Sequence, residues 1–133
     1  MKSHHGTAAG LYYQTYAGTG PGAGRESLVG APPLLLLPGL LGDGRQFRRL
    51  LRGLARPAVI VDPLGSGQSE QPTHEAEYAL PLQARRLLAL LDALELPVVD
   101  VAGLSMGGMW AQHALVQAPQ RFVEQRAPRA EVE

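Results

Sequence analysis

Three short, mainly apolar runs, each followed by sequence with helical periodicity, constrain the fold of this chain most strongly. The runs span residues 34–37, 58–62 and 97–103. Apolar runs of this length, without regular polar alternation, are typical of strands that are covered on both faces. Strands that alternate with helices predict βαβ units and a parallel sheet. The sequence therefore predicts an α/β fold with three layers, in which a mainly parallel sheet lies between helices.

The segments that follow these runs have the apolar spacing of amphipathic helices. The first begins near Asp43, which stands three residues before Gln46 as in a capping box, and continues with apolar residues at positions 47, 50, 51 and 54. The second spans about residues 75–94, and its regular part is expected to begin near residue 80, because Pro81 is tolerated only in a first turn. The third spans residues 106–117.

The first part of the chain, residues 1–30, is predicted to form a strand and a glycine-rich loop. Residues 11–17 mix aromatic and β-branched side chains, which favours a strand. The loop at 18–24 superficially offers the G-x-G-x-x-A pattern of a dinucleotide site. However, the sequence after it does not open a helix, so no helix N-terminus is available for a pyrophosphate. His4 and His5 are compatible with metal binding, but a solvated, disordered pair is the preferred interpretation.

The amino-acid composition excludes several kinds of binding partner and several kinds of reactive group. A formal net charge of +0 gives no basic field for nucleic acid. A chain without cysteine has no disulfide, no thiolate zinc site and no cysteine nucleophile. No apolar run is long enough to span a bilayer, and the N-terminus lacks the apolar core of a signal peptide. We therefore expect a cytoplasmic protein of one domain, with no metal, no cofactor and no membrane or nucleic-acid partner.

One motif with catalytic chemistry joins the third predicted strand to the third predicted helix. It reads G-L-S-M-G at residues 103–107, which is the pattern of a nucleophile elbow that presents Ser105 on a sharp turn. Side chains at Gly103 and Gly107 are expected to collide with the neighbouring strand and helix, and Gly108 extends the stretch of small residues for close packing. The alternative is a tight turn in which the serine caps the helix. The strand-to-helix context favours the nucleophile.

Two further loops are predicted to lie near this serine, because loops at the carboxyl ends of neighbouring parallel strands converge. The first is P-G-L-L-G at residues 38–42, where glycines allow a backbone N–H to turn inward. The N–H groups of Leu40 and Met106 would then form an oxyanion hole, in which each donor contributes roughly 10²–10³ in rate.

The second loop is D-P-L-G-S-G-Q-S at residues 62–69. It resembles a phosphate loop, but it lacks the lysine of a Walker motif, and Glu70 replaces the third glycine of a dinucleotide site. Nucleotide binding through Gly65 and Gly67 is therefore the weakest alternative for the chain.

The three motifs, in this order and spacing, resemble the amino-terminal half of an α/β-hydrolase over about residues 34–122. The resemblance implies that Ser105 is the nucleophile and that Leu40 and Met106 supply the oxyanion amides. It implies structural roles for the other motif residues, which are Gly39, Asp62, Gly65, Gly67, Ser69, Gly103, Gly107 and Gly108. Pro38 is a departure, because histidine is usual at this position in the family.

The catalytic base that this resemblance requires has no obvious candidate. In the family the triad acid and then the histidine follow the nucleophile. His113 lies eight positions after Ser105 in the same predicted helix, about 12 Å along its axis, so its ring is not expected to reach the hydroxyl. His74 precedes the elbow, in a loop whose reach the sequence does not define. A sixth strand would begin near Phe122, but polar sequence interrupted by Pro128 follows instead.

The chain is accordingly predicted to be the first half of a serine hydrolase, truncated after the elbow. Residues 31–122 would form this half-domain, and residues 123–133 a polar, disordered tail. Without a base, the serine is a weak nucleophile, so this chain is predicted to be inactive. A completed enzyme would act on a small-molecule ester or acyl compound. Residues 98–102 would form an open sheet edge, which gives the alternative of a binding half-domain that pairs with a partner chain or with itself.

Overall fold

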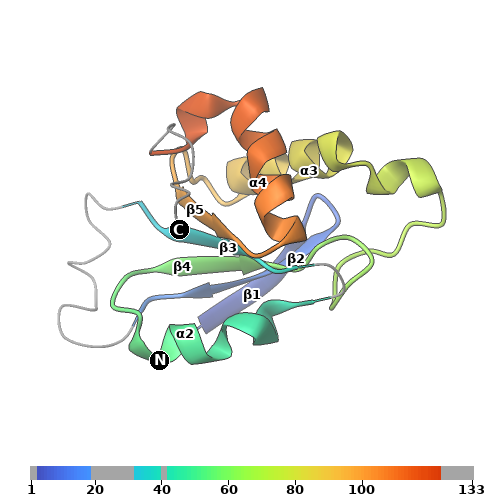
Figure 1. The fold of residues 1–133 in the computed structure, drawn as a ribbon. Helices are drawn as coiled ribbons and strands as arrows, with labels where there is room; N and C mark the ends of the chain where they lie inside the picture. Colours follow the sequence, from blue (N-terminus) through green and yellow to red (C-terminus); the bar gives the residue numbers. More distant parts are fainter. Residues whose placement is uncertain (1–2, 19–31, 40–41, 124–133) are drawn as a thin grey trace.

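A computed structural model of the protein describes residues 3–18, 32–39 and 42–123. Its sheet has five strands in the order β1-β2-β4-β3-β5 (Figure 1). In chain order these are β1 (Ser3–Ala8), β2 (Leu11–Tyr16), β3 (Leu34–Leu37), β4 (Ala58–Val61) and β5 (Asp100–Gly103). β2 pairs in antiparallel orientation with both β1 and β4, whereas β4, β3 and β5 are parallel to one another. The predicted α/β class and the mainly parallel arrangement from residue 34 onward are confirmed.

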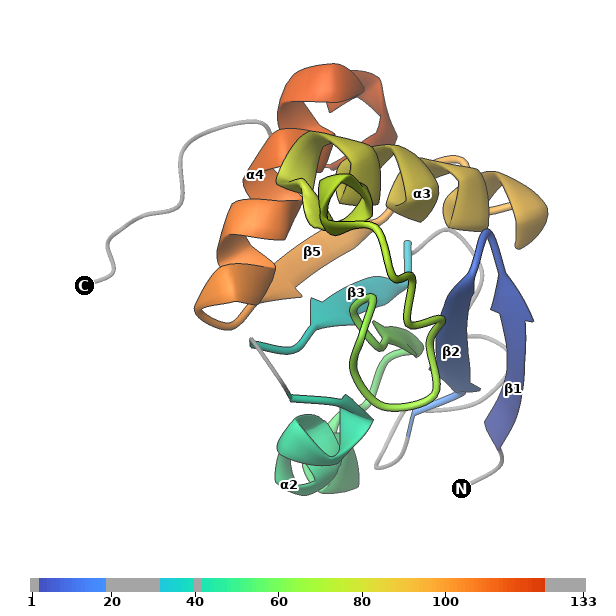
Figure 2. The same cartoon turned by 90° about the vertical axis from the view of Figure 1, so that its right-hand side faces the viewer.

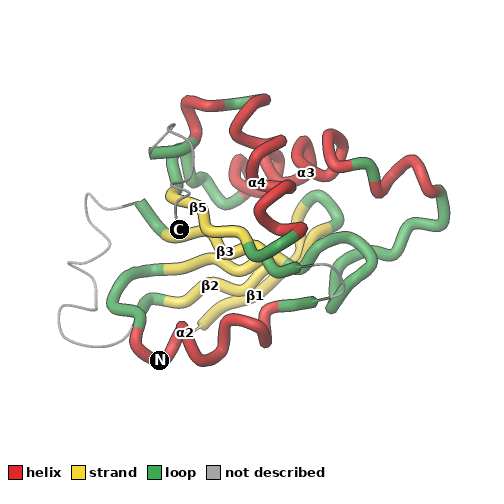
Figure 3. The backbone as a smooth tube through the Cα atoms, viewed as in Figure 1, coloured by secondary structure: helices red, strands yellow, loops and turns green. Residues whose placement is uncertain are grey.

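Helices cover both faces of the sheet and give the predicted three layers. Helices α3 (Leu80–Ala93) and α4 (Met106–Gln117) lie on one face, and α2 (Arg48–Gly53) lies on the other (Figure 2). Figure 3 shows the same layers with helices, strands and loops distinguished. Helix α3 has Pro81 in its first turn, as its sequence required. Short 3-10 turns flank the helices: η1 (Gly44–Phe47), η2 (Glu75–Tyr78) and η3 (Pro119–Arg121).

Alternate residues of the two central strands supply two cores, one on each face of the sheet. The core beneath α3 and α4 includes Leu35, Leu37, Val59 and Val61. The core against α2 includes Leu36, Ala58, Ile60, Phe47 and Leu51. Because both faces of β3 and β4 are buried, their sequences need apolar side chains at every position.

The amino terminus forms a hairpin, and the prediction of a disordered histidine pair was wrong. His4 and His5 belong to β1, which pairs along its whole length with β2. Ala9 (φ +53°) and Gly10 (φ +78°) form the turn, and positive φ at both central positions suits the twist of a two-residue hairpin. The polar sequence of β1 shows no strand alternation, so the backbone ladder to β2 determines this strand. The glycine-rich loop predicted at 18–24 lies outside the described residues beyond position 18.

The turn into the first helix differs from a complete capping box. The carboxylate of Asp43 accepts the N–H of Arg45 at 2.9 Å, so the cap itself is present. The second half of the box is absent, because the Gln46 side chain accepts the N–H of Gly39 at 2.9 Å instead of turning back to the cap residue. This contact joins the loop after β3 to the start of η1.

β5 lies at one edge of the sheet, and its outer side is partly covered. The N–H of Val99 donates to the Arg121 carbonyl at 2.9 Å, and the N–H of Val123 donates to the Val99 carbonyl at 3.1 Å. These bonds make a single parallel bridge between Val99 and Phe122. Within the described ranges, β5 pairs with no strand other than β3, in agreement with the predicted open edge.

Candidate active site

Ser105 stands on a sharp turn between β5 and α4. The carbonyl of Leu104 accepts the N–H of Gly107 at 2.9 Å, which closes a four-residue turn. Ser105 occupies the second position of this turn with φ +57° and ψ −116°. These angles are those of the second residue of a type II′ turn, a position dominated by glycine. A serine held there stores about 1–3 kcal/mol of backbone strain, and such strain is concentrated at functional sites.

Two glycines let this turn pack against the sheet. A β-carbon on Gly103 would overlap the backbone of Gly107 and Gly108, and a β-carbon on Gly107 would overlap the Leu37 carbonyl oxygen. Neither position therefore has room for a side chain. Gly108 differs, because a β-carbon there would lie 3.5 Å from the Gly103 oxygen, which is an ordinary contact. The structure has space for a methyl group at position 108.

The side chain of Ser105 is exposed, and it makes no capping hydrogen bond to α4. The alternative interpretation of this residue as a capping serine is therefore contradicted. Among the described residues, neither the Ser105 hydroxyl nor the N–H of Met106 has a hydrogen-bond partner. Both groups are thus free for a ligand at the first turn of the helix.

The loop after β3 reaches the same turn. A β-carbon on Gly39 would lie 3.2 Å from the Leu104 oxygen and 3.5 Å from the β-carbon of Ser105. The carboxyl ends of β3 and β5 therefore meet at the serine, as expected for a parallel sheet. Leu40, the other predicted oxyanion donor, lies outside the described residues.

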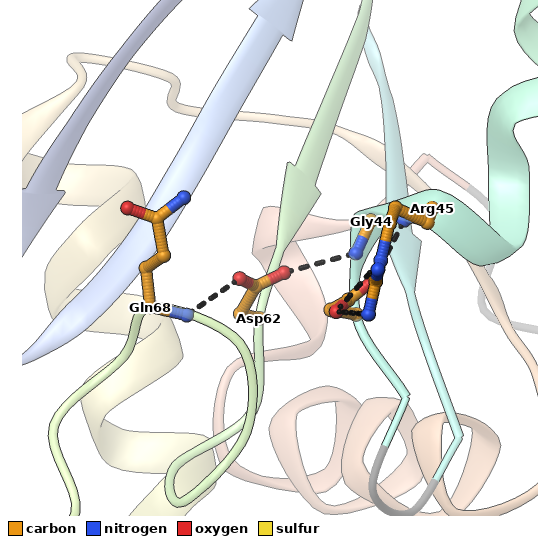
Figure 4. A network of polar contacts seen from close by, with 5 residues as sticks. Gly44, Arg45, Asp62 and Gln68 are labelled. Carbon is orange, nitrogen blue, oxygen red and sulfur yellow. Dashed lines mark hydrogen bonds and ion pairs between the residues drawn. The ribbon is translucent and has the colours of Figure 1, made fainter.

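Asp62, at the end of β4, holds two loops together (Figure 4). Its Oδ1 accepts the N–H of Gly44 and its Oδ2 accepts the N–H of Gln68, both at 3.0 Å. Gly67 makes the second bond possible, because a β-carbon at this position, where φ is +53°, would overlap the carboxylate. Burial raises the pKa of Asp62 above its ordinary value, although both N–H bonds act in the opposite direction.

Ser69 ties the loop after β4 to the neighbouring strand. Its hydroxyl donates to the Asp62 carbonyl at 2.5 Å and accepts the N–H of Tyr12 at 2.8 Å. Gly65, where φ is +80°, leaves room for the ring of Tyr78, which would lie 2.9 Å from a β-carbon at that position. These contacts indicate structural roles for Ser69 and Gly65 in the loop beside Ser105.

The geometry of the same loop does not favour the phosphate binding that the nucleotide alternative requires. The Asp62 carboxylate lies at its centre, where a phosphate would need donors. The loop amides are bonded within the chain, since the N–H groups of Gly65, Ser66 and Ser69 donate to the carbonyls of Glu70, Pro63 and Ser66.

Neither candidate histidine is bonded to the serine. His113 is half-buried in α4, and His74 is exposed just before η2. Within the part of the chain that the structure describes, no hydrogen bond joins either ring to the Ser105 hydroxyl. The described residues also contain no group of three His, Asp or Glu side chains placed to hold a metal ion.

A mixed sheet with three neighbouring parallel strands, helices on both faces and a strained serine between a strand and a helix are typical of the α/β-hydrolases. The model of the alpha/beta hydrolase fold family matches residues 32–123. The chain therefore belongs to the α/β-hydrolase fold family.

Two curated relatives illustrate the range of similarity. The sn-1-specific diacylglycerol lipase ABHD11 of Xenopus tropicalis is 31% identical over 130 residues, which cover 92% of this chain and 37% of the relative. Lipase 1 of Psychrobacter immobilis is 40% identical over 82 residues, which cover 60% of this chain and 26% of the lipase. The chain thus spans well under half the length of these two relatives.

Solved structures match the same architecture. An α/β-hydrolase of Novosphingobium aromaticivorans superposes with a TM-score of 0.72 at 22% identity, covering 91% of this chain and 41% of that one. An esterase of Mycobacterium tuberculosis superposes with a TM-score of 0.73 at 23% identity, covering 91% of this chain and 39% of that one. At this identity the two structures support the fold alone. None of the described helices has the length and apolar character needed to cross a bilayer.

Proposed function

We propose that this chain carries the nucleophile-bearing part of a serine hydrolase that acts on carboxylic esters or related acyl compounds. The observation that carries the proposal is the conformation of Ser105, whose positive φ exposes an unbonded hydroxyl beside the free N–H of Met106. Membership of the α/β-hydrolase family supports it, and the two lipases among the similar proteins favour ester substrates.

The reaction begins with attack of the Ser105 hydroxyl oxygen on the carbonyl carbon, while its proton passes to a base. The N–H groups of Met106 and Leu40 stabilise the oxyanion of the tetrahedral intermediate. Collapse of this intermediate expels the alcohol, which takes the proton from the base, and leaves an acyl-enzyme. Water then hydrolyses the acyl-enzyme and restores the serine.

The chain by itself is proposed to be inactive. No described side chain forms a hydrogen bond with the Ser105 hydroxyl, and a serine without a base is a weak nucleophile. The histidine and the acid would come from polypeptide outside the described residues. The greater length of the relatives supports this division.

Two measurements on the purified chain test the proposal. Hydrolysis of p-nitrophenyl acetate should not exceed the rate in buffer, and turnover that Ser105→Ala abolishes would contradict the proposed inactivity. A serine-directed fluorophosphonate should still modify Ser105 faster than Ser3, which lies outside the elbow, because the Met106 N–H is available to stabilise the oxygen of the attacked phosphonyl group. Peptide mass spectrometry identifies the modified serine. Equal modification of both serines would contradict the nucleophile.

A second function, as a half-domain that pairs with another chain, is favoured by the outer edge of β5. The Val99–Phe122 bridge begins a parallel pairing on this edge. The turn after β5 and helix α4 also carry exposed apolar side chains: Leu104, Met109 and Val116 are 49%, 48% and 81% exposed. Unpaired edges and apolar patches are typical association surfaces. Light scattering of freshly purified protein should detect dimers or a bound partner chain, and a strict monomer without a partner would contradict this function.

A further inference from the structure

A small pocket opens beside the elbow, at the carboxyl ends of the three parallel strands. Its volume is about 130 Å³, and its walls include Leu64, Tyr78, Leu80, Met106, Gly107 and Trp110. It therefore borders the helix end that carries the free Met106 N–H. In open α/β sheets, ligands bind at this end of the strands.

Three wall residues have polar side-chain groups that are bonded to backbone carbonyls of the chain. The Tyr78 hydroxyl donates to the Pro72 carbonyl at 2.7 Å, and the Gln83 amide donates to the Tyr78 carbonyl at 2.8 Å. The Trp110 indole N–H donates to the Gln83 carbonyl at 2.9 Å. With these groups satisfied, the walls offer mainly apolar surface to a ligand.

Ser66 is the exception in this wall. It is 7% exposed, it lines the pocket, and its hydroxyl has no hydrogen-bond partner among the described residues. Buried hydroxyls are nearly always bonded, so an unbonded one marks a position that a ligand or a water molecule satisfies. The pocket thus combines mainly apolar walls with an unbonded hydroxyl group.

The volume limits what the pocket can hold. An apolar protein cavity of about 150 Å³ is large enough to bind benzene. A pocket of about 130 Å³ therefore accepts a six-carbon ring or a short alkyl chain.

We propose that this pocket binds the apolar group of the ester that Ser105 attacks, and that Ser66 hydrogen-bonds an oxygen atom carried by that group. The substrate class is then a small ester with a ring or a short chain of about six carbons. This inference rests on the proposed function, but its physical content is a binding site that needs no catalysis.

Trp110 is the single tryptophan of the chain and is buried in the pocket wall, so its fluorescence reports ligand binding directly. The probes are cyclohexane and cyclohexanol, which do not absorb where tryptophan does. Titration with either probe should give a saturable change in Trp110 emission. Ser66→Ala should weaken the binding of cyclohexanol roughly three- to tenfold, which is the effect of one net hydrogen bond. It should leave the binding of cyclohexane unchanged.

Leu80→Trp should fill the pocket and abolish both titrations. Leu82→Trp is the matched control, because Leu82 lies on the same helix, is 38% exposed and is not part of the wall. Circular dichroism checks that both variants fold. Should Leu80→Trp not fold, Leu80→Ala replaces it, and this enlarged pocket should bind cyclooctanol more tightly than the native chain does.

The proposal that the pocket binds apolar groups would be overturned if neither probe changed the Trp110 emission. It would also be overturned if the Leu80→Trp and Leu82→Trp chains bound the probes equally. Equal binding of cyclohexanol with and without the Ser66 hydroxyl would overturn the polar contact. Ser105→Ala should bind both probes as the native chain does. Binding without preferential modification of Ser105 would therefore contradict the proposed function and leave the binding site standing.

Discussion

Gly107 of α4 packs directly on the carbonyl group of Leu37, the last residue of β3. A β-carbon at position 107 would overlap the Leu37 oxygen and would lie 2.7 Å from the Pro38 oxygen. Backbone therefore touches backbone where the helix begins, and this contact fixes the first turn of α4 against the sheet. The strained turn at Ser105 immediately precedes it.

Substitution of this glycine should destabilise the fold, whereas substitution of the next residue should not. Gly107→Ala is expected to lower the free energy of unfolding by about 1–3 kcal/mol, because the methyl group forces the helix from the sheet. Gly108→Ala is expected to raise it by about 0.5–1 kcal/mol, since alanine is favoured over glycine in a helix and has room there. Urea denaturation followed by circular dichroism measures both, and similar effects would contradict the steric argument.

The backbone strain at Ser105 should be measurable as a difference in the free energy of unfolding between two variants. Ser105→Gly accepts φ +57° without steric cost, whereas Ser105→Ala keeps the strained backbone and loses only an exposed hydroxyl. The glycine variant is expected to be about 1 kcal/mol more stable than the alanine variant, after the larger conformational entropy of unfolded glycine is included. Thermal and urea unfolding of the two variants provide the comparison. A less stable glycine variant would show that the turn is unstrained.

Alanine substitution at the two buried serines of the loop after β4 should affect the free energy of unfolding very differently. Ser69→Ala removes the partner of both the Tyr12 N–H and the Asp62 carbonyl, and it is expected to cost about 1–3 kcal/mol. Ser66→Ala is the matched control, because Ser66 is equally buried and has no hydrogen-bond partner among the described residues. It should change the free energy of unfolding by less than about 0.5 kcal/mol. Comparable losses in both variants would refute the bridging role of Ser69.

Asp62 should give the stability a pH dependence of definite sign. Burial raises the pKa of Asp62 above 3.8, so between pH 3.8 and the raised pKa the native state binds more protons than the unfolded chain. The contribution of this group to stability therefore falls as pH rises through that interval and is constant above the raised pKa.

Asp62→Asn should remove this contribution and leave the other titrating groups in place. The amide supplies one acceptor for the two N–H groups of Gly44 and Gln68, so the variant is also expected to lose about 1–3 kcal/mol near neutral pH. The difference in unfolding free energy between the native chain and the variant, measured by urea titration from acidic to neutral pH, isolates the effect. A pH-independent difference would mean that the carboxyl of Asp62 titrates normally.

Much of the framework could be predicted from sequence because its determinants are local. Apolar runs and helical spacing define β3, β4, α3 and α4, since burial on one or two faces imposes a period on neighbouring residues. The residues G-L-S-M-G predicted the sharp turn at Ser105, and the structure leaves no room for side chains at Gly103 and Gly107.

Tertiary structure decided the features that depend on residues far apart in the sequence. β1 forms because the polar segment containing His4 and His5 pairs with β2, and Ser69 bonds the N–H of Tyr12 across 57 residues. The pocket next to Met106 likewise requires the loops after β3 and β4, the 3-10 turn η2 and two helices to meet. Local sequence determines which backbone conformations are allowed. Long-range pairing selects among them, because buried backbone N–H and C=O groups need partners that often lie far away in the sequence.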